Sequence, residues 1–363
     1  MEQHHLRRTR RSTAIGLAAL LAIGTIVAPR ATATPSATQA RLAGTDRFAT
    51  AAAIAKASYP SGTSSAILAS GRAFPDALAG AALGQPILLT ERDTLPPVTK
   101  QALTDLKVKD VTILGGTAAV SKSVESQLPS GVTVTRIAGN DRYETAAAIA
   151  KSIGAAKVAT LKTFKTALIA TGADFADALA GGPLAASGAG TTAYPVLLVG
   201  SDVPPSTKDA ISSLGIQQVV ILGGTGAVSS AVQAELESET GHPAVRLAGT
   251  NRFGTAVKVA TSAITDFGFK ATEVLVANAF TFADALAGGP LGTLRSAPIV
   301  LTDAERLTDD SSTVIADHAD TIATVTALGG TAAVSESTLS EAKTAAQTPA
   351  KKGTNESYKV APA

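Results

Sequence analysis

Short runs of apolar residues alternate along this chain with longer segments in which apolar side chains recur every three or four positions. The first four runs span residues 66–69, 87–89, 111–114 and 132–137. Continuous apolar runs of this length are typical of strands in a sheet that is covered on both faces. Alternating strands and helices predict a parallel sheet with helices on both faces, a compact Rossmann- or flavodoxin-like α/β unit.

The segments between these runs contain residues that favour helix starts. Phe48, Ala51, Ala52 and Ala55 form one apolar stripe at helical spacing. Polar residues just before this helix and its two later copies can accept hydrogen bonds from the first helical amides. First-turn prolines and capping serines mark further helix starts. The predicted N-caps of the striped helix are Thr45, Asn140 and Thr250, and the other predicted starts are at Pro97, Pro205, Ser121, Ser229 and Ser335.

This pattern occurs three times. The sixteen residues from Arg41 recur from Arg136 with twelve identities, and a looser copy begins at Arg246. Three further blocks follow in the same order: F-x-D-A-L-A-G, a strand of the form P-I/V-L/V-L, and L-G-G-T-x-A-V-S. A spacing of about 100 residues is that of a small domain and exceeds the 20–50 residues of solenoid repeats. We therefore predict repeats at 41–135, 136–245 and 246–343, and a disordered tail at 344–363.

The N-terminus has the order of a secretory signal. Four arginines lie between positions 7 and 11, an apolar run spans 14–28, and Ala31-Thr32-Ala33 supplies small residues for cleavage. We predict a signal peptide over 1–33, with the Sec and twin-arginine routes both open. Its removal takes away five arginines and Glu2, which changes the formal net charge from +2 to −2. A near-neutral chain lacks the basic footprint of a nucleic-acid binder, and no membrane attachment is expected after cleavage.

Composition removes several kinds of chemistry. The chain has no cysteine, so disulfides, thiolate catalysis and cysteine zinc sites are excluded. After the signal only His242 and His318 remain, at non-equivalent places in the repeats. No histidine metal site or catalytic triad can therefore be repeated, and we expect no cofactor. Tryptophan is absent, which disfavours a lectin with stacking platforms.

The ordered blocks closely resemble the cell wall binding repeat type 2 family of Gram-positive surface proteins, over about residues 41–343. That resemblance implies three modules packed as a pseudo-threefold assembly that holds proteins on the wall by binding anionic secondary polymers. It also implies a secreted, wall-associated, non-enzymatic protein whose partner is a teichoic-acid-like polymer, with wall hydrolases as a second class of partner. The P-I-L-L strand corresponds to a family motif associated with wall attachment; physically, we predict a buried central strand.

Three sets of recurring residues are candidates for polymer binding. A guanidinium fork suits phosphate or carboxylate groups, but an internal ion pair with a neighbouring Asp that fixes the first helix is the simpler interpretation of these arginines. A recurring Asp could bind sugar hydroxyls or a bridging cation, or could cap a helix. The Gly-Gly-Thr turns end a strand where open α/β sheets bind ligands, and a tight turn with positive φ also requires glycine. The candidates are Arg47, Arg142, Arg252; Asp76, Asp177, Asp284; Gly115, Gly116, Thr117; Gly223, Gly224, Thr225; and Gly329, Gly330, Thr331.

The alternative function is a peptidoglycan-active enzyme, an amidase or glycosidase, or a modifier of one. A glycosidase needs two carboxylates at a defined separation, and a pair such as Asp76 with Asp46 would supply them. However, Asp46 and Asp141 become Asn251 in the third copy. Binding or capping survives that change, whereas acid–base chemistry that depends on the carboxylate does not. The sequence therefore favours non-covalent wall binding without catalysis.

Overall fold

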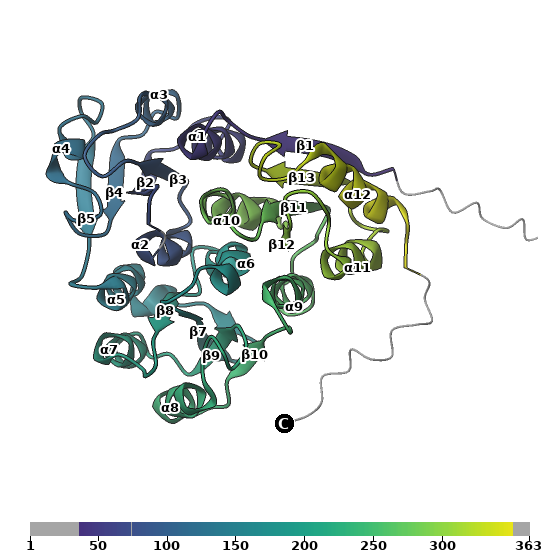
Figure 1. The fold of residues 1–363 in the computed structure, drawn as a ribbon. Coiled ribbons are helices and arrows are strands. Elements are labelled where there is room, and N and C mark those ends of the chain that lie inside the picture. The colour runs from purple at the N-terminus through teal and green to yellow at the C-terminus, as the bar shows by residue number, and fades with distance from the viewer. Residues whose placement is uncertain (1–35, 74, 351–363) are drawn as a thin grey trace, which may run out of the picture. The chain divides into compact units, whose positions relative to one another are not determined.

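The computed structural model describes residues 36–73 and 75–350 (Figure 1). The predicted signal peptide and residues 351–363 lie outside the described residues. None of the helices in the described part is both long enough and apolar enough to cross a membrane.

The first sheet confirms the predicted strands. It has the order β3-β2-β4-β5, and all its strand pairs are parallel. Residues of the two middle strands are almost completely buried between helices, as the continuous apolar runs require. The elements are β2 (Ser65–Ser70), β3 (Ile87–Thr90), β4 (Asp110–Leu114) and β5 (Thr133–Ile137), with helices α1 (Arg47–Ser58), α2 (Pro75–Leu78), η1 (Ala79–Leu83, 3-10), α3 (Pro97–Asp105) and α4 (Lys122–Glu125).

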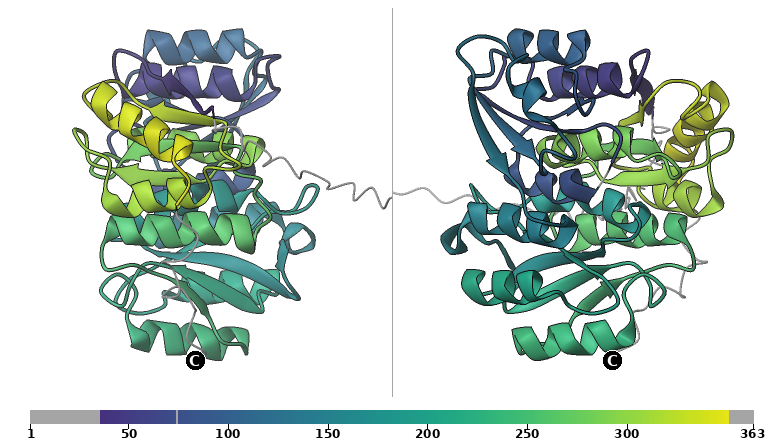
Figure 2. Two further views of the ribbon diagram at one scale, coloured as in Figure 1. Left: turned by 90° about the vertical axis from the view of Figure 1, so that its right-hand side faces the viewer. Right: turned by 60° about the vertical axis from the view of Figure 1, so that its left-hand side comes forward.

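The second sheet repeats this parallel core. Strand β7 lies between β8 and β9, β10 pairs with β9, and the short strand β6 adds an antiparallel edge to β7. Helices lie on both sides of these strands in the turned views of Figure 2. The elements are α5 (Arg142–Ile153), η2 (Ala155–Lys157), β6 (Thr160–Leu161), β7 (Phe164–Thr171), α6 (Ala176–Ala185), β8 (Val196–Val199), α7 (Pro205–Leu214), β9 (Gln218–Leu222), α8 (Ser230–Thr240) and β10 (Val245–Leu247).

The third sheet is completed by the first strand of the described chain. Its order is β1-β13-β11-β12, and Thr38 to Leu42 pair in parallel with Thr324 to Leu328. Strands β5 and β10 likewise begin a sequence repeat yet pair with the preceding sheet. The first strand of each repeat therefore joins the sheet of the preceding repeat. Strand β1 of the first repeat joins the sheet of the third repeat, which closes the ring. The elements are β1 (Thr38–Leu42), α9 (Arg252–Thr265), β11 (Glu273–Asn278), α10 (Ala283–Arg295), β12 (Ile299–Thr302), α11 (Asp309–Asp317), β13 (Thr324–Leu328) and α12 (Glu336–Gln347).

The centre of the ring is built from the F-x-D-A-L-A-G blocks, whose helices α2–η1, α6 and α10 meet there (Figure 1). Gly182 and Gly289 approach so closely that a Cβ on Gly289 would lie 3.3 Å from the Gly182 backbone and 3.4 Å from the Ala81 Cβ. These three residues occupy equivalent positions in the three blocks. The predicted pseudo-threefold assembly of α/β units is confirmed, and small side chains permit its close packing.

The striped helices start one residue later than predicted. The N-caps of α1, α5 and α9 are Asp46, Asp141 and Asn251, whose side chains accept hydrogen bonds from first-turn amides. The prediction of Thr45, Asn140 and Thr250 is therefore wrong, because the next residue in each copy is an equally strong capping type. The predicted proline starts are confirmed at α3 and α7, and the serine starts at α4, α8 and α12.

Two other predictions need correction. Strands β3, β8 and β12 are each the last strand of a parallel ladder rather than a central strand. They are nevertheless buried, because the first helix of their own repeat (α1, α5 or α9) and a helix of a neighbouring repeat both pack against them. A tail beginning at residue 344 is also wrong, since α12 continues to Gln347. Ala342, Ala345 and Ala346 of this helix are buried in the core, and the Gln347 amide donates to the Ala37 carbonyl at 2.9 Å.

Candidate functional site

The candidate residues of different repeats meet where one repeat contacts the next. The Asp and the Gly-Gly-Thr turn of one repeat face the arginine at the start of the next repeat's first helix. The ring therefore has three junctions of one design. The first junction contains Asp76, 115–117 and Arg142; the second contains Asp177, 223–225 and Arg252; and the third contains Asp284, 329–331 and Arg47.

The two glycines of each turn have different roles. Gly115, Gly223 and Gly329 adopt φ of +95°, +115° and +102°. A Cβ on Gly115 would also lie 2.2 Å from Oδ2 of Asp76. The second glycine has open space where its Cβ would be, and the following threonine is exposed. Within the described chain no acceptor is found for the amides of Gly116 and Thr117. Neighbouring free amides in a turn suit an anionic or strongly polar ligand.

The arginine that begins each repeat holds these turns in place. Nη1 of Arg136 donates to the Gly115 carbonyl at 2.7 Å, and its Nη2 lies 2.6 Å from Glu125 Oε1. Arg41 and Arg246 donate in the same way to Gly329 and Gly223, at 2.9 and 2.8 Å. Our sequence reasoning missed these three arginines as site residues. Their repetition at the first position of each block was visible, but the strand exchange that brings them to the preceding turn was not.

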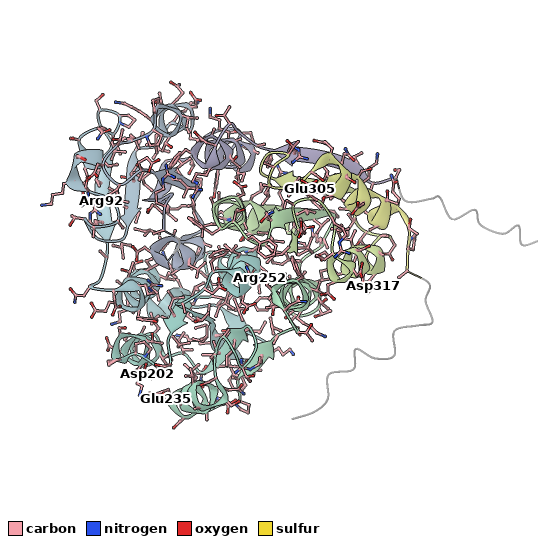
Figure 3. The ribbon with its side chains drawn as sticks, in the orientation of Figure 1. Arg92, Asp202, Glu235, Arg252, Glu305 and Asp317 are labelled. Atoms are coloured by element: carbon pink, nitrogen blue, oxygen red, sulfur yellow. The ribbon has the colours of Figure 1, made fainter. Side chains whose placement is uncertain are left out.

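The candidate arginines are anchored on backbone carbonyls. Arg47 Nη1 donates to Gly71 O at 2.7 Å, Arg142 to Gly172 O, and Arg252 to Ala279 O at 2.9 Å. Each acceptor directly follows the central strand of the arginine's own sheet. The sequence left open an ion pair between these arginines and a neighbouring Asp. Arg252 forms such a pair, since its Nη2 lies 3.6 Å from Asp174 Oδ2. Figure 3 shows Arg252 toward the middle of the molecule, whereas Arg92 and Glu235 lie near its edge.

The three aspartates sit in unfavourable surroundings for a charge. Burial raises the pKa of Asp76 and of Asp177, and the facing arginine and threonine of the next repeat oppose that rise. Burial raises the pKa of Asp284 to about 6, against the opposing charge of Arg47. Among the described residues, no backbone amide at the start of a helix donates a hydrogen bond to any of these three carboxylates. Carboxylates that cost stability in all three copies are candidates for a functional role.

The first junction opens into a cleft of about 420 Å³. It is lined by the free turn at Gly116 and Thr117, by Asp141 and Arg142 at the start of the next repeat's first helix, and by Asp76. Asp141 is committed to its helix, because Oδ1 accepts the amides of Tyr143 and Glu144 at 2.8 Å. The carboxylate pair of Asp76 and Asp46 that the sequence suggested is not formed. Asp76 shares its cleft with Asp141, whereas Asp46 caps helix α1 at the third junction.

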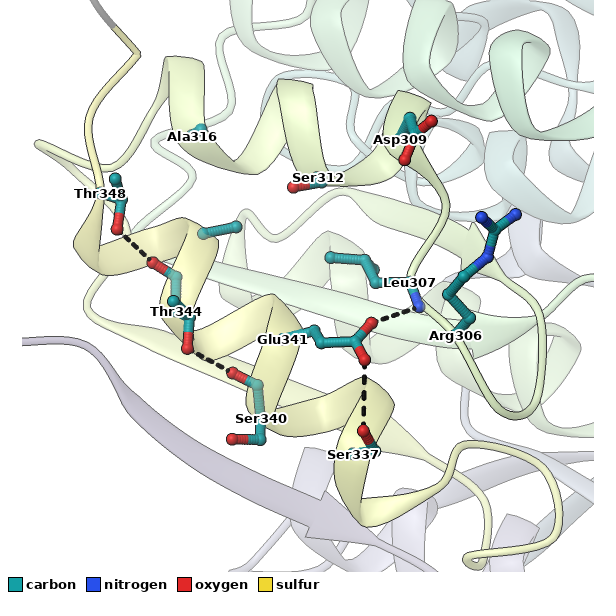
Figure 4. Close-up of a pocket in the computed structure, with 11 residues that line it drawn as sticks. Arg306, Leu307, Asp309, Ser312, Ala316, Ser337, Ser340, Glu341, Thr344 and Thr348 are labelled. Atoms are coloured by element: carbon teal, nitrogen blue, oxygen red, sulfur yellow. Dashed lines mark hydrogen bonds between the residues drawn. The ribbon is translucent and has the colours of Figure 1, made fainter.

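The third repeat carries a separate groove of about 760 Å³ between α11 and α12, whose lining is shown in Figure 4. Glu341 crosses it, accepting the Leu307 amide at 2.9 Å and the Ser337 hydroxyl at 3.2 Å. In the second repeat the equivalent Glu235 lies 2.5 Å from Lys208. Ser312 stands at the lysine position in the third repeat and lines the groove.

The described chain shows neither a metal-binding group nor a histidine at the junctions. No group of three or more His, Asp or Glu side chains among these residues could hold a metal ion. The His242 ring packs on Phe164 with centroids 3.9 Å apart, and His318 bonds its own helix at the Val314 carbonyl. Both histidines therefore have structural contacts away from the junctions.

A ring of three α/β repeats with one polar junction between each pair defines a three-module binding protein. The model of the family named cell wall binding domain 2 (CWB2) matches residues 41–125, 136–233 and 246–339. The chain belongs to this family.

Relatives and solved structures agree with that assignment. The chain is 32% identical over 309 residues to the N-acetylmuramoyl-L-alanine amidase LytC of Bacillus subtilis (strain 168), covering 84% of this chain and 58% of that protein. It is 28% identical to the amidase enhancer of the same organism, covering 77% of this chain and 37% of the relative. Cwp6 from Clostridium difficile superimposes with a TM-score of 0.77 at 29% identity, covering 86% of this chain and 48% of that one.

Cwp8 from Clostridium difficile gives a TM-score of 0.72 at 28% identity, covering 85% of this chain and 51% of that chain. The chain thus spans from about a third to somewhat more than half of the length of these proteins. The shared part is the three-repeat ring.

Proposed function

We propose that the chain is exported and attaches non-covalently to anionic secondary polymers of the cell wall through its repeat junctions. The observation that supports this most directly is the first junction, where an arginine and two free backbone amides line one open cleft. A guanidinium fork and turn amides are the donors that phosphate and carboxylate groups prefer. Repetition along a polymer allows several weak contacts to act together.

The partly buried aspartates make the proposed binding depend on pH. An acid group placed beside Asp76 favours the protonated carboxyl, whose pKa burial already raises. The protonated form can donate a hydrogen bond to the polymer instead of repelling it. We therefore expect binding to strengthen as the pH falls toward the raised pKa of Asp76.

The direct test is co-sedimentation of the purified chain with isolated cell walls, before and after extraction of their anionic polymers, across a salt series. We expect binding that weakens as salt rises and that is lost on extraction, with no muropeptides or sugars released. Failure to sediment with unextracted walls, or equal binding to extracted walls, would contradict the proposal.

A second role, as a modifier of wall hydrolases, is favoured by one observation: two relatives are an amidase and an amidase enhancer. Adding the chain to a wall amidase acting on native walls tests it. A change in the rate of muropeptide release that the chain also causes on polymer-free walls would support direct contact with the hydrolase. An effect seen only on native walls would indicate shared occupancy of the polymer instead.

A further inference from the structure

The three junctions share a design but differ in what surrounds the arginine. Three positions in each junction differ between the repeats. The first lies three residues before the recurring Asp. The second lies four residues before the corresponding Asp of the next repeat, and the third directly follows the P-I-L-L strand of that next repeat. The first junction has Ala73, Ala173 and Gly200; the second has Asp174, Phe280 and Asp303; the third has Thr281, Arg72 and Glu91.

In the second junction the arginine is already occupied. Asp174 Oδ2 lies 3.6 Å from Arg252 Nη2, and the Arg252 Cζ lies 5.1 Å from the centre of the Phe280 ring. The guanidinium thus has a carboxylate at one edge, a carbonyl at another and an aromatic ring against its face. A ligand acid must displace Asp174 before it can form a fork with Arg252.

In the third junction the arginine shares its charge with a surface pair. Glu91 bonds Arg72 through both carboxylate oxygens, and the charge of Arg47 also contributes to the lowered pKa of Glu91. Arg47 lies 5.7 Å from the centre of the Phe282 ring and faces the buried Asp284. Two carboxylates therefore compete with any ligand acid for Arg47.

In the first junction the three variable positions carry no charge and almost no bulk. Ala73 lines the cleft with Arg142, and a Cβ on Gly200 would lie 3.1 Å from the neighbouring Tyr143 hydroxyl. Among the described residues Arg142 forms no ion pair, and its bonded partner is the Gly172 carbonyl. Of the two carboxylates in its cleft, Asp76 faces it and Asp141 caps its own helix, whereas Arg252 has Asp174 and Arg47 has Glu91 as a further carboxylate neighbour.

We propose that the first junction alone holds an acid group of the wall polymer, with Arg142 as the binding residue and Ala73 as the residue that keeps it available. Phosphate and carboxylate share the required chemistry. The second and third junctions then serve chiefly to close the ring. The inference rests on the proposed wall-binding function, because it specifies which of the candidate residues perform it.

The test is a calorimetric titration of the full chain with anionic polymer extracted from the walls, counted per acid group. We expect one site per chain. Arg142→Gln should weaken binding about tenfold or more, the usual loss for a charge-assisted hydrogen bond, and Arg252→Gln less than about twofold. Equal losses for the two variants would overturn the inference while leaving wall binding intact.

Two exchange variants separate this effect from damage to the fold. Ala73→Asp keeps Arg142 but gives it the neighbour that Arg252 has, and should weaken binding by up to about fivefold, which is the loss that a competing ion pair of roughly 0.2–1 kcal/mol allows. Asp174→Asn keeps the oxygen that accepts the Phe175 amide at 2.7 Å but frees Arg252, and should raise the site count toward two. No effect of either variant, in chains whose circular dichroism and melting match the parent, would overturn the inference.

Binding to teichoic-type polymer but not to a polyuronic acid would identify phosphate as the bound group, and the reverse would identify carboxylate. Both outcomes support the inference. If the parent chain binds no wall polymer, both the proposed function and this inference are wrong.

Discussion

The first and second junctions are built from the same four sequence blocks, yet among the described residues the arginine forms no ion pair in the first junction and forms one in the second. The conserved parts, namely the Asp, the positive-φ glycine and the carbonyl-bound arginine, are present in both. The difference lies in residues outside the repeated motifs, where Ala73 and Ala173 stand against Asp174 and Phe280. Motif identity therefore specifies the ring, whereas the intervening positions specify which arginine can meet a ligand.

The comparison also separates stability from binding. Every junction retains a partly buried carboxylate whose pKa is raised, and within the described chain none of the three caps its helix by a hydrogen bond to a backbone amide. A group that destabilises the folded state at neutral pH and is present three times indicates a role other than folding. The predictions below test each part of the junction in turn.

The largest effect is expected from closing the turn itself. Gly115→Ala places a Cβ 2.2 Å from Asp76 Oδ2 in a backbone of positive φ, so it should destabilise the chain by about 2–4 kcal/mol. Gly116→Ala is the matched control, because nothing lies within 4 Å of its added Cβ, and it should cost less than about 1 kcal/mol. Denaturant unfolding measures both, and equal costs would contradict the division of roles between the two glycines.

The next effect concerns the buried charge of the third junction. The folded-state pKa of Asp284 is about 6, above its ordinary value, so the folded chain binds the proton more tightly than the unfolded chain does. Its contribution to stability is present below about pH 4 and is lost as the pH rises through about 6. Asp284→Asn should therefore raise the unfolding free energy by about 2–3 kcal/mol at pH 7 and change it little at pH 4.

Thermal melts across this pH range measure the difference, and Asp177→Asn should act in the same direction. Stabilisation by Asp284→Asn that is equal at pH 4 and pH 7 would show that the substitution acts through packing rather than through the charge.

The smallest effect on stability is expected at the exposed pair of the second junction. Asp174 is about half exposed and lies 3.6 Å from Arg252, so their coupling should amount to roughly 0.2–1 kcal/mol. A double-mutant cycle with Asp174→Asn and Arg252→Gln isolates it from other changes. A coupling of several kcal/mol would mean that Asp174 holds the ring together, and its presence would then say little about ligand access.

The sequence predicted the parallel α/β units, their strands and their number, because buried strands and striped helices leave local patterns that recur. It could not predict which sheet a strand joins: the pattern around Arg41 and Arg136 is the same whether the strand pairs within its repeat or with the preceding one. The caps were placed one residue early because Thr45 and Asp46 are both good capping types. The start of the last helix was predicted at Ser335, but its end was placed too early, because its buried face is made of small alanines such as Ala342 and Ala346.

Candidate residues were predictable as a set, but their grouping was not. Asp76 and Arg142 lie in different repeats and come together only through closure of the ring. The roles of Ala73 and Gly200 left no sequence signal of their own, since a small residue that leaves space looks like any other small residue. Comparison of non-identical positions between the repeats was the signal that could have found them.

The most direct test of the account is to move the site within the ring. In the double variant Ala73→Asp, Asp174→Asn, the first junction acquires the competing carboxylate and the second loses it. Titration with extracted wall polymer should still give one site per chain, but Arg252→Gln should now abolish binding and Arg142→Gln should have little effect. Binding that still depends on Arg142, or that depends equally on both arginines, would contradict the claim that these neighbours decide which junction binds.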